Sequence, residues 1–247
     1  MITRKGLMKV VPHSVRNVLR MVCGSEYAED GLVAARITDF LFSGKFVGAY
    51  EMGKSTGSWG SGDLRWRVFV ACWAAQYAKS LPGDFVECGV NRGGMARAVM
   101  EYVNFSTLDK KFYLLDTYSG IPDEMKHSSA PLAFDYSECF EDVKKTFAQY
   151  SNVKIIRGTV PMTLPHVESN RIAYLSIDMN CAEPEIAAAE FFWDKISAGG
   201  VLVLDDYCYS EPYRLQYKAF NDFAKTRNVE VLALPTGQGL VFKPHNQ

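Results

Sequence analysis

Acidic side chains stand at or next to the carboxyl ends of four apolar segments, each of which predicts a buried strand. These residues are Glu87, Asp116, Asp178 and the neighbouring pair Asp205 and Asp206. Ligands of open α/β sheets bind outside the carboxyl ends of the strands, so these acids are predicted to surround one site. Carboxylates beside apolar strands cost free energy unless they meet a ligand, a metal ion or a helix N-terminus.

Three of these acids predict a metal site. Asp178, Asp205 and Asp206 come from the ends of adjacent strands, where their charges would repel one another without a cation. Hard oxygen ligands of this kind suit Mg²⁺ or Ca²⁺. Asn180 could add a neutral oxygen. The alternative is that one or two of the acids face inward while the others cap helices.

A glycine-rich segment, ECGVNRGG, covers residues 87–94 and predicts a nucleoside site. Its glycines permit a tight turn, and the helix that starts there offers free backbone N–H groups. The spacing is not GxGxxG, which argues against a dinucleotide and a nicotinamide-dependent oxidoreductase. Asp116 could accept hydrogen bonds from both ribose hydroxyls. The alternative is a turn or cap residue before Thr117.

The elements that must position these residues alternate between strand and helix. Strands are expected at 84–88, 111–116, 152–157, 171–178 and 200–206, and a closing hairpin at 229–234 and 240–243. Helices are expected at 63–80, 94–103, 136–150, 184–196 and 213–226, the first with Val68, Cys72, Ala75 and Tyr77 among its buried residues. This order predicts an α/β fold with a mostly parallel, seven-stranded sheet and an antiparallel C-terminal hairpin strand.

The N-terminal part is expected to differ from the rest. Residues 1–50 predict short helices, and GKSTGSWGSG at 53–62 predicts a domain boundary or a mobile flap. We therefore divide the chain into an N-terminal helical extension with its flap, residues 1–62, and a ligand-binding α/β domain, residues 63–247. The N-terminal helices could pack against a second subunit in a homodimer.

Composition restricts the partners. The formal net charge is −1, which argues against nucleic acid, because phosphate binding draws on a concentrated basic surface. No apolar run approaches the ~18 residues that a membrane span needs, so no stable membrane insertion is expected. Six cysteines are scattered without CxxC spacing, which favours reduced thiols and a cytoplasmic location.

Four segments, in order, carry a resemblance to a known family. GDFVECGVNRGG, LLDTYSGIPDE, LSIDMN and SAGGVLVLDDY resemble the macrocin/mycinamicin-type (TylF-like) sugar O-methyltransferases, which are class I S-adenosylmethionine (SAM)-dependent enzymes. The resemblance runs from about Tyr50 to Lys243. It implies a Rossmann-like fold, SAM and Mg²⁺ as cofactors, and methyl transfer to a small-molecule acceptor with vicinal hydroxyls.

The resemblance also implies roles for individual residues. It places Mg²⁺ on Asp178, Asp205 and Asp206, with Asp178 also at the cofactor and in catalysis, and it makes His127 the catalytic base. It places SAM on Met52, near the sulfonium, and on Glu87, Gly89, Asn91, Gly93, Gly94, Asp116, Ser119, Gly158 and Thr159.

One departure from the family pattern bears on the metal. Members often carry Asp-Gly-Asp where this chain has Asp178-Met179-Asn180, so one negative charge is lost and Met179 adds bulk. Metal affinity or acceptor preference could therefore differ. Two other functions stay open: a catechol-type O-methyltransferase, since catechols also offer a vicinal diol, and a non-catalytic SAM-binding module.

Overall fold

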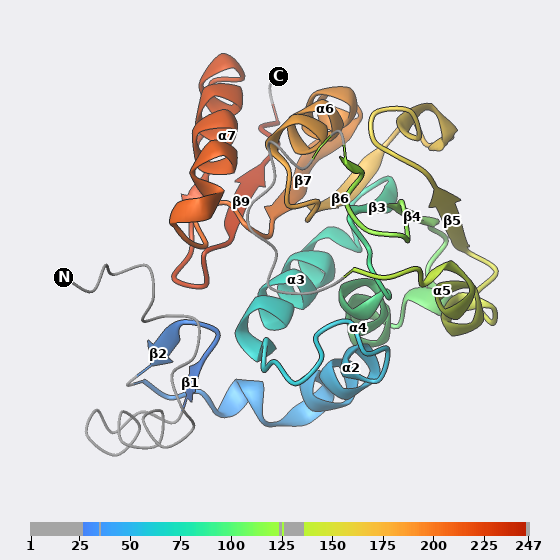
Figure 1. The fold of residues 1–247 in the computed structure, drawn as a ribbon, viewed down its shortest axis with the longest axis vertical. Coiled ribbons are helices and arrows are strands. Elements are labelled where there is room, and N and C mark those ends of the chain that lie inside the picture. The colour runs from blue at the N-terminus through green and yellow to red at the C-terminus, as the bar shows by residue number, and fades with distance from the viewer. Residues whose placement is uncertain (1–26, 35, 124, 126–135, 246–247) are drawn as a thin grey trace.

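A seven-stranded sheet organises the molecule (Figure 1). The computed structural model describes residues 27–34, 36–123, 125 and 136–245. The strand order is β5-β4-β3-β6-β7-β9-β8. The strands are β3 (Asp84–Cys88), β4 (Phe112–Asp116), β5 (Val153–Arg157), β6 (Ile172–Ile177), β7 (Ile196–Leu204), β8 (Leu232–Ala233) and β9 (Gly239–Phe242).

Strands β3 to β7 are parallel, and β9 runs antiparallel to both β7 and β8. The predicted sheet, mostly parallel with an antiparallel C-terminal hairpin, is thereby confirmed. The register sets Cys88 of β3 opposite Leu115 of β4 and Ile177 of β6. The carboxyl ends of these strands therefore lie at one edge, which brings the acids that follow them together.

Helices cover both faces of the sheet. They are α2 (Gly44–Lys54), α3 (Arg65–Ala78), α4 (Gly94–Val103), α5 (Phe140–Phe147), α6 (Ala182–Trp193) and α7 (Arg214–Thr226). Short 3-10 turns occur at Asp39–Leu41, Phe105–Thr107, Leu164–His166 and Glu211–Tyr213. Figure 1 shows α3 and α4 on one side of the sheet and α6 and α7 on the other.

Alternating side chains along each strand divide the core into two layers. On β3, Phe85 packs with residues of α2 to α5, whereas Val86 and Cys88 pack with residues of α6 and α7. Both faces of the strand are buried, as expected for a parallel sheet covered by helices. Glu87 has the same parity as Phe85, so it points toward the layer of α3 and α4.

Two helix predictions need correction. Tyr77 was expected to be buried on α3 but is 42% exposed. It lies nine residues after Val68, and at about 100° per residue this places it on the opposite side of the helix. The helix expected at 136–150 begins only at Phe140 and ends at Phe147.

The prediction of short helices before residue 50 is wrong for residues 27–34, which form a β-hairpin. Strands β1 (Tyr27–Glu29) and β2 (Leu32–Ala34) are antiparallel, and Asp30 and Gly31 make the turn with φ of 50° and 75°. Two positive φ values are the signature of a type I′ turn, for which Asp-Gly is a preferred sequence. Helix α2 agrees with the prediction.

The glycine- and serine-rich segment after α2 packs against the α/β core. Trp59 is buried and stacks on Tyr50, with ring centroids 5.2 Å apart. The Ser58 hydroxyl accepts a hydrogen bond from the backbone N–H of Gly94 at 2.8 Å. Residues 55–62 therefore bring α2 against the start of α4.

Two further predictions can be compared with the described residues. None of their helices has the length and hydropathy needed to cross a bilayer. Five cysteines, Cys72, Cys88, Cys139, Cys181 and Cys208, are free thiols, as expected from their scattered spacing.

Candidate functional site

A cavity of about 520 Å³ opens at the carboxyl edge of the sheet. Its volume is in the ~300–1,000 Å³ range of small-molecule sites. Of the predicted site residues, it is lined by Glu87, Gly89, Asn91, Asp116, Gly158, Thr159, Asp178, Asp205 and Asp206. The hairpin β1–β2 also contributes to the lining, through residues 28–33, which the sequence analysis did not anticipate.

Other predicted site residues lie elsewhere. Met52, on α2, is 37% exposed and is not part of the cavity lining, and neither are Gly93 and Gly94. Ser119 lines a smaller neighbouring hollow together with Gly158 and Thr159. His127 falls outside the residues that the structure describes.

The turn after β3 needs glycine at its first position. Gly89 has a φ of 91°, and a Cβ atom there would stand 1.9 Å from the carbonyl oxygen of Asp178. The N–H of Asp178 donates to the carbonyl of Cys88 at 2.8 Å, so the ends of β3 and β6 are held in direct contact. Gly93 has a φ of 85°, and a Cβ there would meet the Phe147 ring at 2.5 Å.

Asp116 joins the turn after β3 to the turn after β4. Its Oδ2 accepts the backbone N–H groups of Val90 at 2.7 Å and Asn91 at 2.8 Å. Its Oδ1 accepts the N–H of Tyr118 at 2.6 Å and the hydroxyl of Thr117 at 3.2 Å. A carboxylate offers about four lone-pair positions, so these donors already use its capacity. The contacts match the turn role, and a ribose contact stays a prediction.

Glu87 is the opposite case, a buried carboxyl group without a partner. Its side chain lines the cavity although the residue is only 1% exposed, and neither carboxyl oxygen has a hydrogen bond among the described residues. Burial, followed by the negative charge of Asp205, raises the pKa of Glu87 well above its ordinary value, against the lowering effect of the Ala96 backbone N–H, which lies near the carboxyl group without completing a hydrogen bond to it. A buried polar group of this kind costs free energy unless a ligand supplies the missing donor.

The three aspartates at the ends of β6 and β7 converge. Asp178, Asp205 and Asp206 each offer an oxygen within 4.8 Å of the others. Burial, followed by the charges of Asp205 and Asp206, raises the pKa of Asp178 well above its ordinary value. Burial also raises the pKa of Asp206 to about 6, against the opposing effect of Arg67. Carboxylates packed this closely favour a bound cation.

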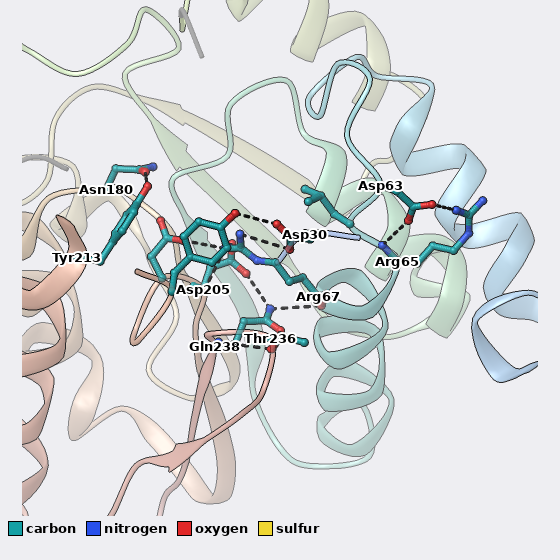
Figure 2. A network of polar contacts seen from close by, with 12 residues as sticks. Asp30, Asp63, Arg65, Arg67, Asn180, Asp205, Tyr213, Thr236 and Gln238 are labelled. Carbon is teal, nitrogen blue, oxygen red and sulfur yellow. Dashed lines mark hydrogen bonds and ion pairs between the residues drawn. The ribbon is translucent and has the colours of Figure 1, made fainter. Parts of the chain in front are cut away.

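Arg67, on α3, supplies a positive charge that sequence reasoning missed. Its Nη2 donates to Asp205 Oδ2, to the Asp205 carbonyl at 3.0 Å and to Asp206 Oδ1 at 2.8 Å. Gln238 Nε2 donates to Asp205 Oδ1 at 2.7 Å and to the Arg67 carbonyl at 3.3 Å. Figure 2 shows this network between α3 and the β8–β9 hairpin. A signal was present in the sequence, since Arg67 directly precedes the predicted buried face of its helix.

Asn180 holds an aromatic side of the cavity. Its Oδ1 accepts the Tyr213 hydroxyl at 3.0 Å (Figure 2). Tyr213 packs edge-to-face against Tyr209. Asn180 has a φ of 58°, which asparagine tolerates better than most residues. The oxygen considered as a metal ligand is thus engaged in a hydrogen bond. Glu185 accepts the N–H of Met179 at 3.1 Å, and burial raises its pKa to about 8.

Comparisons with known proteins identify the family of the chain. The family model described as Macrocin-O-methyltransferase (TylF) matches residues 54–232. The chain is 25% identical over 154 residues to mycinamicin III 3''-O-methyltransferase of Micromonospora griseorubida, covering 56% of this chain and 60% of that protein. It is 28% identical over 155 residues to a rhamnosyl-tetracenomycin-C 4'-O-methyltransferase of Streptomyces olivaceus, covering 55% and 57%. The chain thus spans less than two thirds of the length of these relatives.

Solved structures share the fold. The O-methyltransferase NovP superposes with a TM-score of 0.61 at 20% identity, covering 83% of this chain and 97% of that one. An O-methyltransferase from Bacillus cereus, solved with S-adenosylhomocysteine (SAH), superposes with a TM-score of 0.58 at 11% identity, covering 83% and 94%. These similarities confirm the predicted Rossmann-like fold.

Proposed function

Because the chain belongs to the macrocin-O-methyltransferase (TylF) family, we propose that it is an enzyme that methylates a hydroxyl group of a sugar or sugar-containing small molecule. SAM is the proposed methyl donor, and a Mg²⁺ ion at the acidic cluster is the proposed metal. The names of the relatives from Micromonospora and Streptomyces support a sugar acceptor. The SAH-bound structure of the Bacillus protein supports the cofactor.

One observation carries the proposal: a single cavity contains an unpartnered buried carboxyl group and a separate cluster of three carboxylates. The methionine part of SAM carries an ammonium group, which fits Glu87. Three oxygen ligands on adjacent strand ends fit a hard divalent cation. Holding both reactants in one cavity in an aligned geometry can remove ~7–11 kcal/mol of a reaction barrier.

Glu87 is expected to bind the ammonium group of the cofactor as an anion. Glu87→Gln keeps the shape of the side chain but cannot offer an anion to the ammonium group. Hydrogen bonds to charged groups contribute ~1.5–3 kcal/mol, so we expect SAH to bind about tenfold to a hundredfold more weakly in calorimetric titration. Without ligand, the variant should have the melting temperature of the wild type, because burial already favours the uncharged form of Glu87.

A matched control is Glu141→Gln on α5, where the side chain is exposed and pairs with Lys144. This variant should bind SAH as the wild type does. An unchanged dissociation constant in Glu87→Gln would remove Glu87 from the cofactor site.

The residues around the cluster fit a metal-assisted reaction. Asp178, Asp205 and Asp206 would hold the ion, and Gln238 with Arg67 keeps the carboxylate of Asp205 in place. The chemistry that Mg²⁺ supplies when bound is to orient neighbouring hydroxyls and lower their pKa. We propose His127 as the base that takes the proton from the hydroxyl group of the acceptor. The tyrosines at 209 and 213 give the acceptor ring an apolar surface next to the acids.

Metal removal gives the second prediction, which also tests the function. With SAM and a panel of rhamnosides, other glycosides and catechols, we expect SAH release with a sugar and not with a catechol. Excess EDTA should lower the rate at least a hundredfold, and Mg²⁺ should restore it. Turnover that resists EDTA would contradict the metal, and preferred methylation of a catechol would contradict the acceptor class. SAH binding without product from any acceptor would indicate a non-catalytic module. A cytoplasmic location and a homodimer stay predictions.

A further inference from the structure

A buried arginine lies inside the acidic cluster, where it competes for the oxygens that a metal would use. We infer that Arg67 is an internal counter-cation that shares Asp205 and Asp206 with the divalent cation and moves its pairing toward Asp30 when that cation binds. This inference rests on the proposed metal site. It gives Arg67 a role beyond orienting the ligands, because it predicts that the arginine weakens metal binding.

The charges of the cluster support this role. Asp30, the three aspartates of the cluster and one guanidinium carry a formal charge of −3, which one divalent cation lowers to −1. Without the arginine the same carboxylates would carry −4 in a buried place, where like charges are costly. Arg67 thus supplies part of the positive charge that keeps the site folded in the absence of metal.

The hydrogen bonds of Arg67 are unevenly distributed over the guanidinium. Nη2 makes all three contacts to Asp205 and Asp206. Nε has no hydrogen-bond partner among the described residues, although it is buried. Nη1 lies 3.9 Å from Asp30 Oδ2, which is an ion-pair distance but longer than a hydrogen bond. The guanidinium therefore has unused donors on the side away from the cluster.

Asp30 is positioned to pair more closely with the Arg67 guanidinium. Its Oδ1 accepts the Tyr209 hydroxyl at 2.8 Å, which restrains the side chain of Asp30 at the turn of the β1–β2 hairpin. The Arg67 guanidinium also lies over the Tyr209 ring, with its Cζ atom 4.7 Å from the ring centroid. When a divalent cation attracts the oxygens of Asp205 and Asp206, Arg67 can shift toward Asp30 without losing its ion pairing.

The contact between Arg67 and Asp30 also reaches the β1–β2 hairpin. Residues 28–33 of the hairpin line the cavity, and Asp30 is their link to Arg67. Occupation of the metal site is therefore coupled to the hairpin through one side chain. Gln238 donates to the other oxygen of Asp205, so that the carboxylate stays in place while Arg67 shifts.

The affinity of the full chain for a divalent metal ion tests the inference. The dissociation constant of Mn²⁺ is measured by electron paramagnetic resonance for the wild type, Arg67→Met and Arg67→Lys, with the Mg²⁺-induced rise in melting temperature as a second readout. We expect Arg67→Met to bind Mn²⁺ at least tenfold more tightly and to show a larger Mg²⁺-induced rise than the wild type. Arg67→Lys keeps the charge and should stay within about threefold of the wild-type constant.

Arg97→Met is the matched control, because Arg97 is also a buried arginine but pairs with Glu101 on α4. It should leave Mn²⁺ binding unchanged. Weaker Mn²⁺ binding by Arg67→Met than by the wild type would overturn the inference, because Arg67 would then serve only to orient ligands. Equally weakened Mn²⁺ binding by Arg67→Lys would overturn it for the same reason. If Arg67→Met folds only with metal present, that requirement itself supports the counter-cation role.

Different results would contradict the metal site and the counter-cation role of Arg67. Absence of Mn²⁺ binding in the wild type would contradict the metal site and the inference that rests on it, while SAH binding in the same samples still tests the cofactor site. Normal Mn²⁺ binding by the wild type, with no tightening in Arg67→Met, would contradict the inference and leave the proposed function in place.

Discussion

Replacing Asp178 by asparagine is expected to lower the turnover of methyl transfer about a thousandfold while the fold persists. Asp205 and Asp206 both accept hydrogen bonds from Arg67, whereas Asp178 receives no side-chain hydrogen bond from the described residues. Its charge is therefore the one least compensated by the protein and the most available to a cation. A loss of ~4 kcal/mol in transition-state stabilisation corresponds to this factor.

Stability should not suffer in this variant. Burial disfavours the charged form of Asp178 and raises its pKa, so a neutral amide of the same shape relieves repulsion with Asp205 and Asp206. The variant should keep or increase the wild-type melting temperature in EDTA. A purely structural role for Asp178 predicts the reverse, with a lower melting temperature and a rate that follows the folded fraction.

Initial rates at a series of Mg²⁺ concentrations check this prediction. Asp222→Asn is the control, since Asp222 is exposed on α7 and pairs with Lys218. It should show wild-type rates at every concentration. A rate for Asp178→Asn above a tenth of the wild-type value at saturating Mg²⁺ would show that the metal does not depend on this carboxylate.

The sheet and the acids at its edge could be predicted because their signals are local. Strands β4, β6 and β7 are nearly continuous apolar runs, and an acid at the end of such a run is visible in the sequence itself, as at Asp116 and Asp178. A parallel sheet brings the carboxyl ends of its strands to one edge, so the acids were expected to lie together. These signals require no knowledge of which distant residue meets which acid.

The partners of those acids could not be predicted in the same way. Arg67 and Asp205 are 138 positions apart, and Gln238 reaches Asp205 from a third element. Helix periodicity gives the buried face of α3 but does not identify the charge that Arg67 meets there. Asp116 illustrates the converse, because its position was predicted while its backbone donors depend on the conformation of the neighbouring turn.

The β1–β2 hairpin was missed although a signal existed. Asp30-Gly31 is a preferred type I′ turn sequence, but its flanking strands have three residues each, too few to show alternation. The hairpin is stabilised instead by burial of Tyr27 and Ala34 in the core and by the contacts of Asp30 with Tyr209 and Arg67. Tertiary contacts therefore supplied what local propensity did not.

Gly89→Ala is expected to destabilise the fold by about 3–5 kcal/mol, the largest stability effect among these predictions. The φ of 91° is unfavourable for any residue with a side chain, and the new Cβ would lie 1.9 Å from the Asp178 carbonyl oxygen. That oxygen belongs to the backbone, so it cannot move without separating β3 from β6. Unfolding in urea and by heat measures the effect, and the melting temperature should fall by roughly 10 °C or more.

Gly48→Ala supplies the control, because Gly48 lies within α2 and a Cβ there meets no atom within 4 Å. Alanine is a better helix former than glycine, so this variant should be as stable as the wild type or up to ~1 kcal/mol more stable. A melting temperature of Gly89→Ala within 2 °C of the wild type would mean that the ends of β3 and β6 are not in contact as described. The cofactor turn and the metal cluster share that contact, since Gly89 packs on the carbonyl of Asp178. A fold that tolerated alanine there would therefore have to hold the two halves of the site apart.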